Sequence, residues 1–298
     1  MILSIPQEYF KAGKIASKVC EEMAKKISVG DKVLDICNKV ESMIKNLGGE
    51  PAFPCNVGIN SITAHYTAEI DDENIIKNGD VVKIDLGVHL NGYIVDTAFT
   101  LSFNPDYDSL VKATEDVLKE AIGIVRGGVR AGDIGRLIEN GASKRGFRPI
   151  SNLSGHLLQQ YKIHGGVSIP NVWVASTPSL KAYEVYAIEP FLTTLDGAGL
   201  VVDDKRRNIY ALIGRKRTGN KSLDLLVEQI WKRFRTLPFT TRWLIDLFDK
   251  NEIKEMLDKL VQMKILHSYP VLVEASKKVV AQFEHTLTPT DSGVIVLT

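Results

Sequence analysis

The chain has 298 residues, of which 44% are hydrophobic and 24% charged, and its formal net charge is +1. This composition is typical of a globular protein with a buried core, and the small net charge excludes a general electrostatic attraction to nucleic acid or membranes. Three cysteines without a CxxC motif favour a reducing, cytoplasmic environment. No segment approaches the roughly 20 apolar residues of a membrane-spanning helix, so no membrane partner is expected.

Two helices are predicted near the start of the chain. The first covers residues 6–27, where apolar residues recur at helical spacing, and the second begins near Asp31 and ends at Gly48-Gly49. A β-hairpin follows them. Two runs rich in β-branched residues flank Asn91-Gly92, the dipeptide that a type I′ turn favours.

The order of elements then repeats. Helices are predicted at residues 106–125 and from about residue 132, and strands follow. Gly30-Asp31 and Gly132-Asp133 open the second helix of each half, which indicates a duplicated helix-helix-strand unit. Two such halves facing each other would form a cleft with side chains from both.

Residues 205–269 have a different pattern. Three short helical runs precede a β-like turn, an arrangement that resembles a small winged-helix insert. The strand pattern resumes afterwards. The predicted division is therefore a main domain at 1–204 and 270–298 that the helical insert at 205–269 interrupts.

The hairpin carries two aspartates inside hydrophobic strands. If Asn91-Gly92 is a two-residue turn, Asp85 faces Ala98, and Asp96 lies two residues away on the same face. The two carboxylates are then diagonal neighbours about 7–8 Å apart by Cα. Paired buried carboxylates require a cation or a proton. Alternatively, both aspartates lie on the polar, solvent-facing side of a half-buried hairpin.

Three distant segments add further metal-binding side chains. Glu189 and Glu284 each lie in a hydrophobic strand, and His156 and His164 lie in a glycine-bounded, turn-rich segment. Each glutamate alone fits an edge-strand charge, and each histidine a structural group. Together the residues form a sensible ligand set for two divalent cations, Co, Mn, Fe(II) or Zn, in a site for amide hydrolysis. The predicted metal ligands are Asp85, Asp96, His156, Glu189 and Glu284.

These segments resemble the methionine aminopeptidases, and most closely their type II branch. The resemblance lies in AHYT around His65, KIDLGVHLNGYIVDTAFT, NLSGHLLQQYKIHGG, EVYAIEPF and AQFEHT, and it covers nearly the whole chain. It implies the α+β pita-bread (creatinase/aminopeptidase-like) fold, with pseudo-two-fold duplicated halves and the type II helical insert. It also implies a metal-dependent enzyme that removes the initiator methionine from nascent proteins by metal-hydroxide attack on the first peptide bond.

The resemblance also implies residue roles. Glu189 is expected to be a ligand and general base, His164 to stabilise the developing oxyanion, and His65 to contact the scissile amide nitrogen. The methionine side chain would occupy an apolar pocket that includes Phe53, Ile163 and Tyr269. The expected partner is the N-terminal methionine of a nascent polypeptide, and the expected state is a monomer.

The insert is locally basic. Residues 205–242 hold eleven Lys and Arg against Asp224 and Glu228, with aromatic residues among them. One interpretation is a solvated helix face over a small aromatic core. The other is transient association with ribosomal RNA.

Two other functions stay open at this stage. An Xaa-Pro peptidase of the same fold would share the ligands, although such relatives usually carry an extra N-terminal domain. A non-catalytic, ribosome- or nucleic-acid-associated binding module would share the fold but usually lacks some ligands, and all five positions are filled here.

Overall fold

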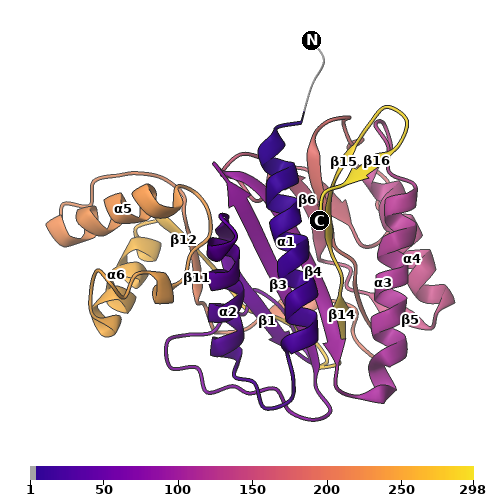
Figure 1. The fold of residues 1–298 in the computed structure, drawn as a ribbon, viewed down its shortest axis with the longest axis horizontal. Helices are drawn as coiled ribbons and strands as arrows, with labels where there is room; N and C mark the ends of the chain where they lie inside the picture. The colour runs from indigo at the N-terminus through magenta and orange to yellow at the C-terminus, as the bar shows by residue number, and fades with distance from the viewer. Residues whose placement is uncertain (1–4) are drawn as a thin grey trace.

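The computed structural model describes residues 5–298, and Figure 1 shows two α/β halves side by side with a smaller insert on one flank. The first half contains the helices α1 (Gln7–Lys26) and α2 (Val33–Asn46). Its strands are β1 (Glu50–Ile59), β2 (Ile62–Ala64), β3 (Val81–Leu90) and β4 (Tyr93–Ser102). Strands β1, β3 and β4 form one antiparallel sheet, and α1 and α2 pack against it.

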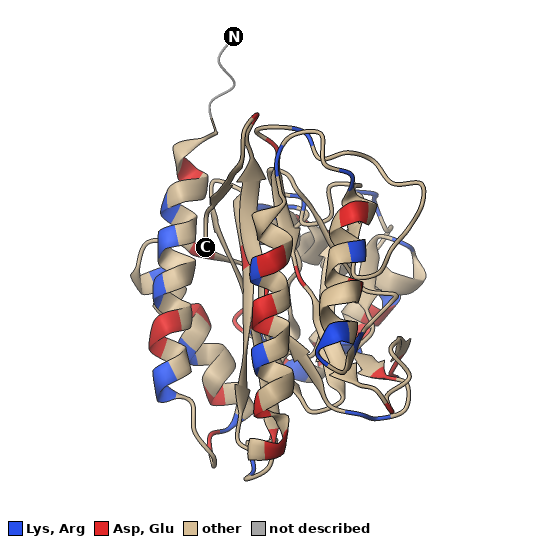
Figure 2. Ribbon diagram, turned by 90° about the vertical axis from the view of Figure 1, so that its right-hand side faces the viewer, with Lys and Arg blue, Asp and Glu red and all other residues tan. Residues whose placement is uncertain are grey.

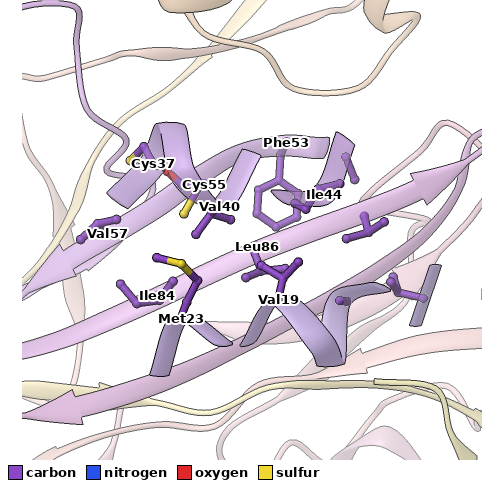
Figure 3. Close-up of a cluster of buried hydrophobic side chains, with 14 of the residues drawn as sticks. Val19, Met23, Cys37, Val40, Ile44, Phe53, Cys55, Val57, Ile84 and Leu86 are labelled. Carbon is purple, nitrogen blue, oxygen red and sulfur yellow. Dashed lines mark hydrogen bonds between the residues drawn. The ribbon is translucent and has the colours of Figure 1, made fainter. Parts of the chain in front are cut away.

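The core of the first half lies between these helices and the sheet (Figure 3). Val19 and Met23 of α1 and Val40 and Ile44 of α2 recur at helical spacing, and all four are fully buried. Leu86 of β3 faces them. Burial of each large aliphatic side chain contributes about 1.5–3 kcal/mol, so this interface fixes the sheet that carries Asp85 and Asp96.

The predicted hairpin register is confirmed. Leu90 pairs with Tyr93 and Asp85 with Ala98. Asn91 and Gly92 both have positive φ, 53° and 83°, as a type I′ turn requires.

The second half begins with the 3-10 helix η1 (Pro105–Tyr107), α3 (Asp108–Gly123) and α4 (Ala131–Lys144). Its strands are β5 (Phe147–Pro149), β6 (Ser154–Leu158), β7 (Ser168–Pro170), β8 (Val185–Ile188), β9 (Phe191–Thr194) and β10 (Val201–Asp203). The chain returns from the insert in β13 (Leu272–Glu274), β14 (Val280–Gln282), β15 (His285–Pro289) and β16 (Val294–Val296). These strands form three sheets, with the orders β16-β15-β8-β6-β7, β14-β9-β5 and β10-β13-β2, the last of which includes β2 of the first half.

The outer faces of the helices carry mixed charges (Figure 2). On α3, Lys112 and Lys119 pair with Asp116 and Glu115 at a spacing of four residues. Such pairs stabilise an exposed helix by a few tenths of a kcal/mol each. No described helix has both the length and the apolar character needed to cross a membrane.

The duplication is real, but the two dipeptides chosen from the sequence are not equivalent. Gly30-Asp31 precedes α2, whereas Gly132-Asp133 lies in the first turn of α4. The matching residues are Lys32 and Arg130, which immediately precede α2 and α4 and form isolated antiparallel bridges with Ile75 and Ser179. Lys32 and Arg130 are equivalent by their position in the fold and by their bridges, which a comparison of dipeptides in the sequence cannot reveal.

The insert has its own core. It consists of β11 (Ile209–Leu212), α5 (Lys221–Phe234), the 3-10 helix η2 (Thr241–Trp243), α6 (Lys250–Gln262) and β12 (Leu266–Tyr269). Buried side chains between Tyr210 and Leu266 form a separate hydrophobic cluster. The second predicted helix is only the short η2. The domain boundaries at 204/205 and 269/270 stay predictions.

One buried ion pair joins the insert to the first half. Arg242 of η2 donates to both carboxylate oxygens of Glu41 on α2, at 2.8 and 3.0 Å, and to the carbonyl oxygen of Ala68 at 2.7 Å. The indole Nε1 of Trp243 donates to Glu41 as well. Arg242 was counted in the basic run of the insert, but its side chain is buried and belongs to this anchor.

We predict that Arg242→Met destabilises the protein by about 3–5 kcal/mol, because it leaves the Glu41 carboxylate buried without its cation. Urea unfolding measures the loss. The control is Arg233→Met, which breaks the pair between Arg233 and Asp246 on the surface of the insert and should cost about 1 kcal/mol or less. Equal losses in the two variants would contradict the anchoring role.

Candidate metal centre

A cavity of about 360 Å³ opens between the two halves, and the insert supplies part of its wall. The side chains singled out from the sequence come from segments far apart in the chain. All of them line this one cavity: Phe53, His65, Asp85, Asp96, His156, Ile163, His164, Glu189, Tyr269 and Glu284. Their co-location is a structural fact, whereas their individual roles stay predictions.

Both glutamates lie where a strand changes sheets, and not in the middle of a strand as predicted. Glu189 lies between β8 and β9, and Glu284 lies between β14 and β15. Strands β8 and β15 belong to the five-stranded sheet, and β9 and β14 to the three-stranded sheet. Pro190 lacks an N–H and helps to end β8. The two breaks bring both carboxylates into the cavity.

Hydrogen bonds between the halves hold the aspartates against Glu284. The Thr97 hydroxyl donates to the carbonyl oxygen of Glu284 at 2.8 Å, and the main chains of Ala98 and Glu284 exchange two hydrogen bonds. The Thr286 hydroxyl donates to the carbonyl oxygen of Asp96 and accepts from its N–H, both at 2.7 Å. Asp96 on β4 and Glu284, just before β15, are therefore fixed through their backbones.

His156 lies in the short strand β6, within the segment that the sequence predicted to be rich in turns. Its Nε2 lies 3.4 Å from Glu189 Oε1 and 3.7 Å from Asp96 Oδ2. Donor atoms of Asp96, His156 and Glu284 all lie within 4.8 Å of one another, close enough to share one metal ion. Asp85 accepts a hydrogen bond from Asn56 Nδ2 at 3.4 Å.

Several of these polar atoms are buried without a hydrogen-bond partner. They are Asp85 Oδ1, Asp96 Oδ1, Glu284 Oε1 and the Nδ1 of His156. A buried carboxylate oxygen left unpaired is costly. Oxygen ligands with one imidazole suit a divalent cation, so the donor set fits a metal centre.

The carboxylates hold protons tightly in the absence of a cation. Burial raises the pKa of Asp85 to about 7. Burial, and then repulsion from Asp85 and Glu189, raises the pKa of Asp96 well above its usual value. The pKa of Glu284 is raised by burial and by Asp96, and that of Glu189 by burial and by Asp85. Raised pKa values in several neighbouring carboxylates are expected at a site that binds a cation.

The histidines form an uncharged row beside the carboxylates. Burial lowers the pKa of His156 to about 3 and of His65 to about 4, and it also lowers the pKa of His164. The His156 and His164 rings meet edge to face with centroids 4.7 Å apart. Neutral imidazoles can ligate a metal or exchange hydrogen bonds with a substrate.

His65 directly follows β2 and lies outside any strand. Its φ of 61° is uncommon for a residue other than glycine. Its Nδ1 lies 3.3 Å from the carbonyl oxygen of Pro270, and its ring meets the edge of Tyr269 at a centroid distance of 5.5 Å. From this position its imidazole lines the cavity.

The rest of the cavity wall is largely apolar. Phe53 of β1, Ile163 and Tyr269 of β12 line it as the resemblance implied. Ile209 of β11 and Pro238 come from the insert and complete the wall. Two residues of the cavity were not predicted from the sequence: Pro238, and Asn56, whose amide contacts Asp85. Asn56 could have been found from the sequence, because a polar asparagine is unusual inside a hydrophobic strand such as β1.

Comparison with known proteins agrees with this geometry. The family model of metallopeptidase family M24 matches residues 7–212. The methionine aminopeptidase of Pyrococcus horikoshii is 43% identical, with 97% of each chain covered, and that of Methanocaldococcus jannaschii is 41% identical, with 98% of each covered. The solved methionine aminopeptidase of Thermotoga maritima superimposes with a TM-score of 0.71 at 22% identity, covering 99% of this chain and 98% of that one.

The fold and the cavity are thus those of a pita-bread metallopeptidase. The full-length relatives decide between its branches. The chain belongs to the methionine aminopeptidases of metallopeptidase family M24. An Xaa-Pro peptidase or a non-catalytic module is disfavoured, because the relatives that match nearly the whole chain at 41–43% identity carry neither description.

We predict that Glu284→Gln stabilises the chelator-treated protein at pH 8. The raised pKa of Glu284 means that the folded protein binds this proton more tightly than the unfolded chain, so wild-type stability is lost as pH rises above about 4.5, the ordinary glutamate value. Glutamine removes this loss, and the advantage of the variant should shrink towards pH 5. Thermal unfolding with EDTA measures the difference.

The matched control is Glu228→Gln on the exposed face of α5, which should have little effect at either pH. Added Mn²⁺ should reverse the ranking and stabilise the wild type more than Glu284→Gln. A variant that is less stable than the wild type in EDTA at pH 8 would argue against carboxylate repulsion at this position.

Proposed function

We propose that this enzyme hydrolyses the peptide bond after an N-terminal methionine, and that five side chains of the cavity hold two divalent cations for this reaction. The ligands are Asp85, Asp96, His156, Glu189 and Glu284. The observation that carries the proposal is the convergence of four mutually repelling carboxylates and one neutral imidazole at one end of an apolar cavity.

Two cations of the Mn, Fe(II), Co or Zn type, when bound there, would polarise the scissile carbonyl and lower the pKa of a water molecule. The remaining tasks fall to side chains. Glu189 is the least enclosed of the three carboxylates around His156 and faces the cavity, so it takes the proton of the attacking water and passes it to the leaving amine.

The two further histidines bind the reacting amide. Since the His65 Nδ1 faces the carbonyl oxygen of Pro270, its proton resides on Nδ1 and Nε2 is left as an acceptor for the scissile N–H. His164 lies against His156 and donates to the carbonyl oxygen as negative charge develops on it. Both act as neutral groups, in keeping with their lowered pKa values.

The apolar wall binds the methionine side chain. Phe53 and Tyr269 offer aromatic surfaces, which a thioether contacts favourably, and Ile163 and Ile209 add aliphatic surface. The carboxylate end of the cavity receives the charged α-amino group. Such a cavity accepts a chain terminus and excludes an internal segment, as an exopeptidase requires. We further propose, as the resemblance implied, that the enzyme acts as a monomer on nascent chains in the cytoplasm.

We predict that the protein, loaded with Mn²⁺ or Co²⁺, releases methionine from a Met-Gly peptide, and that Glu189→Gln and His65→Ala each reduce kcat/KM roughly 10²–10⁴-fold. The assay is chromatographic detection of free methionine. Glu184→Gln, which changes a carboxylate outside the cavity, should retain activity. Release of an N-terminal residue from Xaa-Pro peptides in preference to Met-Gly would reject the substrate assignment.

We further propose that the exposed basic residues of the insert contact ribosomal RNA transiently. Arg215 and Arg235 flank the Trp231 ring, each with its guanidinium carbon 4.9 Å from the centroid. Lys216, Arg217 and Lys221 extend the charge along the surface. A cluster of this kind attracts phosphates at low salt.

The expected result is that Arg215→Glu/Arg217→Glu/Lys221→Glu reduces co-sedimentation with ribosomes at low salt severalfold and leaves kcat/KM on a free peptide unchanged. The control replaces Lys112 and Lys119 on α3 with glutamate. Undiminished co-sedimentation of the triple insert variant would reject the RNA contact and leave the peptidase proposal intact.

A further inference from the structure

Lys83 of β3 is a fully buried lysine, with an exposed fraction of 1%. Its Nζ donates to two main-chain carbonyl oxygens, those of Asn60 and Val280, at 2.9 Å each. The ammonium is thus held by carbonyl dipoles rather than by a carboxylate.

Stability alone does not favour a lysine here. Removing an ammonium from water costs several kcal/mol, and methionine would fill nearly the same volume without that cost. The space is tight as well, because a Cβ on Gly58 would lie 3.0 Å from the Lys83 Cε. The presence of a lysine at this position therefore indicates that its two hydrogen bonds to main-chain carbonyl groups have a specific role.

The two carbonyl groups belong to segments that lead to the cavity. Asn60 lies in the turn between β1 and β2, with a φ of 54°, and β2 runs directly into His65. Val280 opens β14, which leads to Glu284. Lys83 itself precedes Asp85 by two residues on β3. One ammonium therefore ties together the backbones that carry His65, Asp85 and Glu284.

The position of Lys83 complements the threonine contacts between the halves. Thr97 and Thr286 join β4 to the chain around Glu284, and the Thr100 hydroxyl donates to the carbonyl oxygen of Gln282 at 2.6 Å. These hydrogen bonds fix the β14–β15 segment against β4. Lys83 adds the link to β3, the strand of Asp85. The separation between Asp85 and Glu284 thus depends on both sets of contacts.

We propose that Lys83 is a positioning residue, whose buried ammonium sets the distance between Asp85 on one half and Glu284 on the other so that both cations bind. The proposal rests on the proposed function, in which these two carboxylates are metal ligands. Lys83 contacts neither substrate nor cation. It acts through the backbone of β14 and the turn at Asn60.

The test compares Lys83→Met with Leu118→Ala, a core variant in α3 of the second half that lowers stability by creating a cavity. Both are metal-stripped and titrated with Mn²⁺ by calorimetry, and their Co²⁺ complexes are examined by visible absorption. kcat and KM are measured on a Met-Gly peptide for both variants at saturating metal.

The proposal expects Lys83→Met to weaken the lower-affinity cation roughly 10–100-fold, the range found when residues that orient metal ligands are removed. Its Co²⁺ spectrum should change, and kcat should fall at least about tenfold while KM changes less than about threefold. Leu118→Ala, although destabilised, should keep wild-type metal affinities and spectrum.

Wild-type metal binding and spectrum in a folded Lys83→Met would overturn the proposal and leave Lys83 as a purely structural residue. If Lys83→Met does not fold, Lys83→Arg decides. It keeps the cation but displaces the donor, so weakened Mn²⁺ binding supports positioning, and wild-type binding overturns it. A wild-type protein that binds fewer than two cations would instead contradict the proposed function, so the two failures are distinguishable.

Discussion

Electrostatic repulsion among four enclosed carboxylates is the constraint on which this structure depends. Asp85, Asp96, Glu189 and Glu284 would move apart or stay protonated if the chain were free to relax. The four carboxylates come from both halves: Asp85 and Asp96 from the β3–β4 hairpin, and Glu189 and Glu284 from the breaks between β8 and β9 and between β14 and β15. Two half-domains with their helices on the outside hold the carboxylates in place. Hydrogen bonds of Thr97, Thr286 and Lys83 join the two halves rigidly.

Much of the first half could be predicted from local patterns. The Asn91-Gly92 turn fixes the hairpin register by itself, and this register places Asp85 and Asp96 on one face. Features that depend on contacts between distant segments are less evident in the sequence. The strand breaks at Glu189 and Glu284 follow from a change of sheet, which alternation of apolar residues does not encode. The ligand set was nevertheless suggested by the chemistry of glutamates in apolar surroundings.

Other residues could not be assigned from the sequence for definite physical reasons. The positive φ of His65 depends on the path that the chain takes after β2, and nothing in the local residues signals it. Nothing in the sequence separates Arg242 from the other basic residues of the insert. Its tertiary contact with Glu41 shows that it is an anchor. The insert contributes Ile209, Pro238 and Tyr269 to the cavity wall, so the anchor also maintains the shape of the binding site.

The position of Glu284 in the chain has a consequence for biosynthesis. The β14–β15 segment crosses back to the first half, so Asp85 and Asp96 on the early hairpin wait for a partner that is translated about two hundred residues later. With Glu284 as a metal ligand, as we propose, a copy of this enzyme that is still emerging from a ribosome would lack a complete catalytic centre. Activity would then require that the chain is released and folded through residue 284.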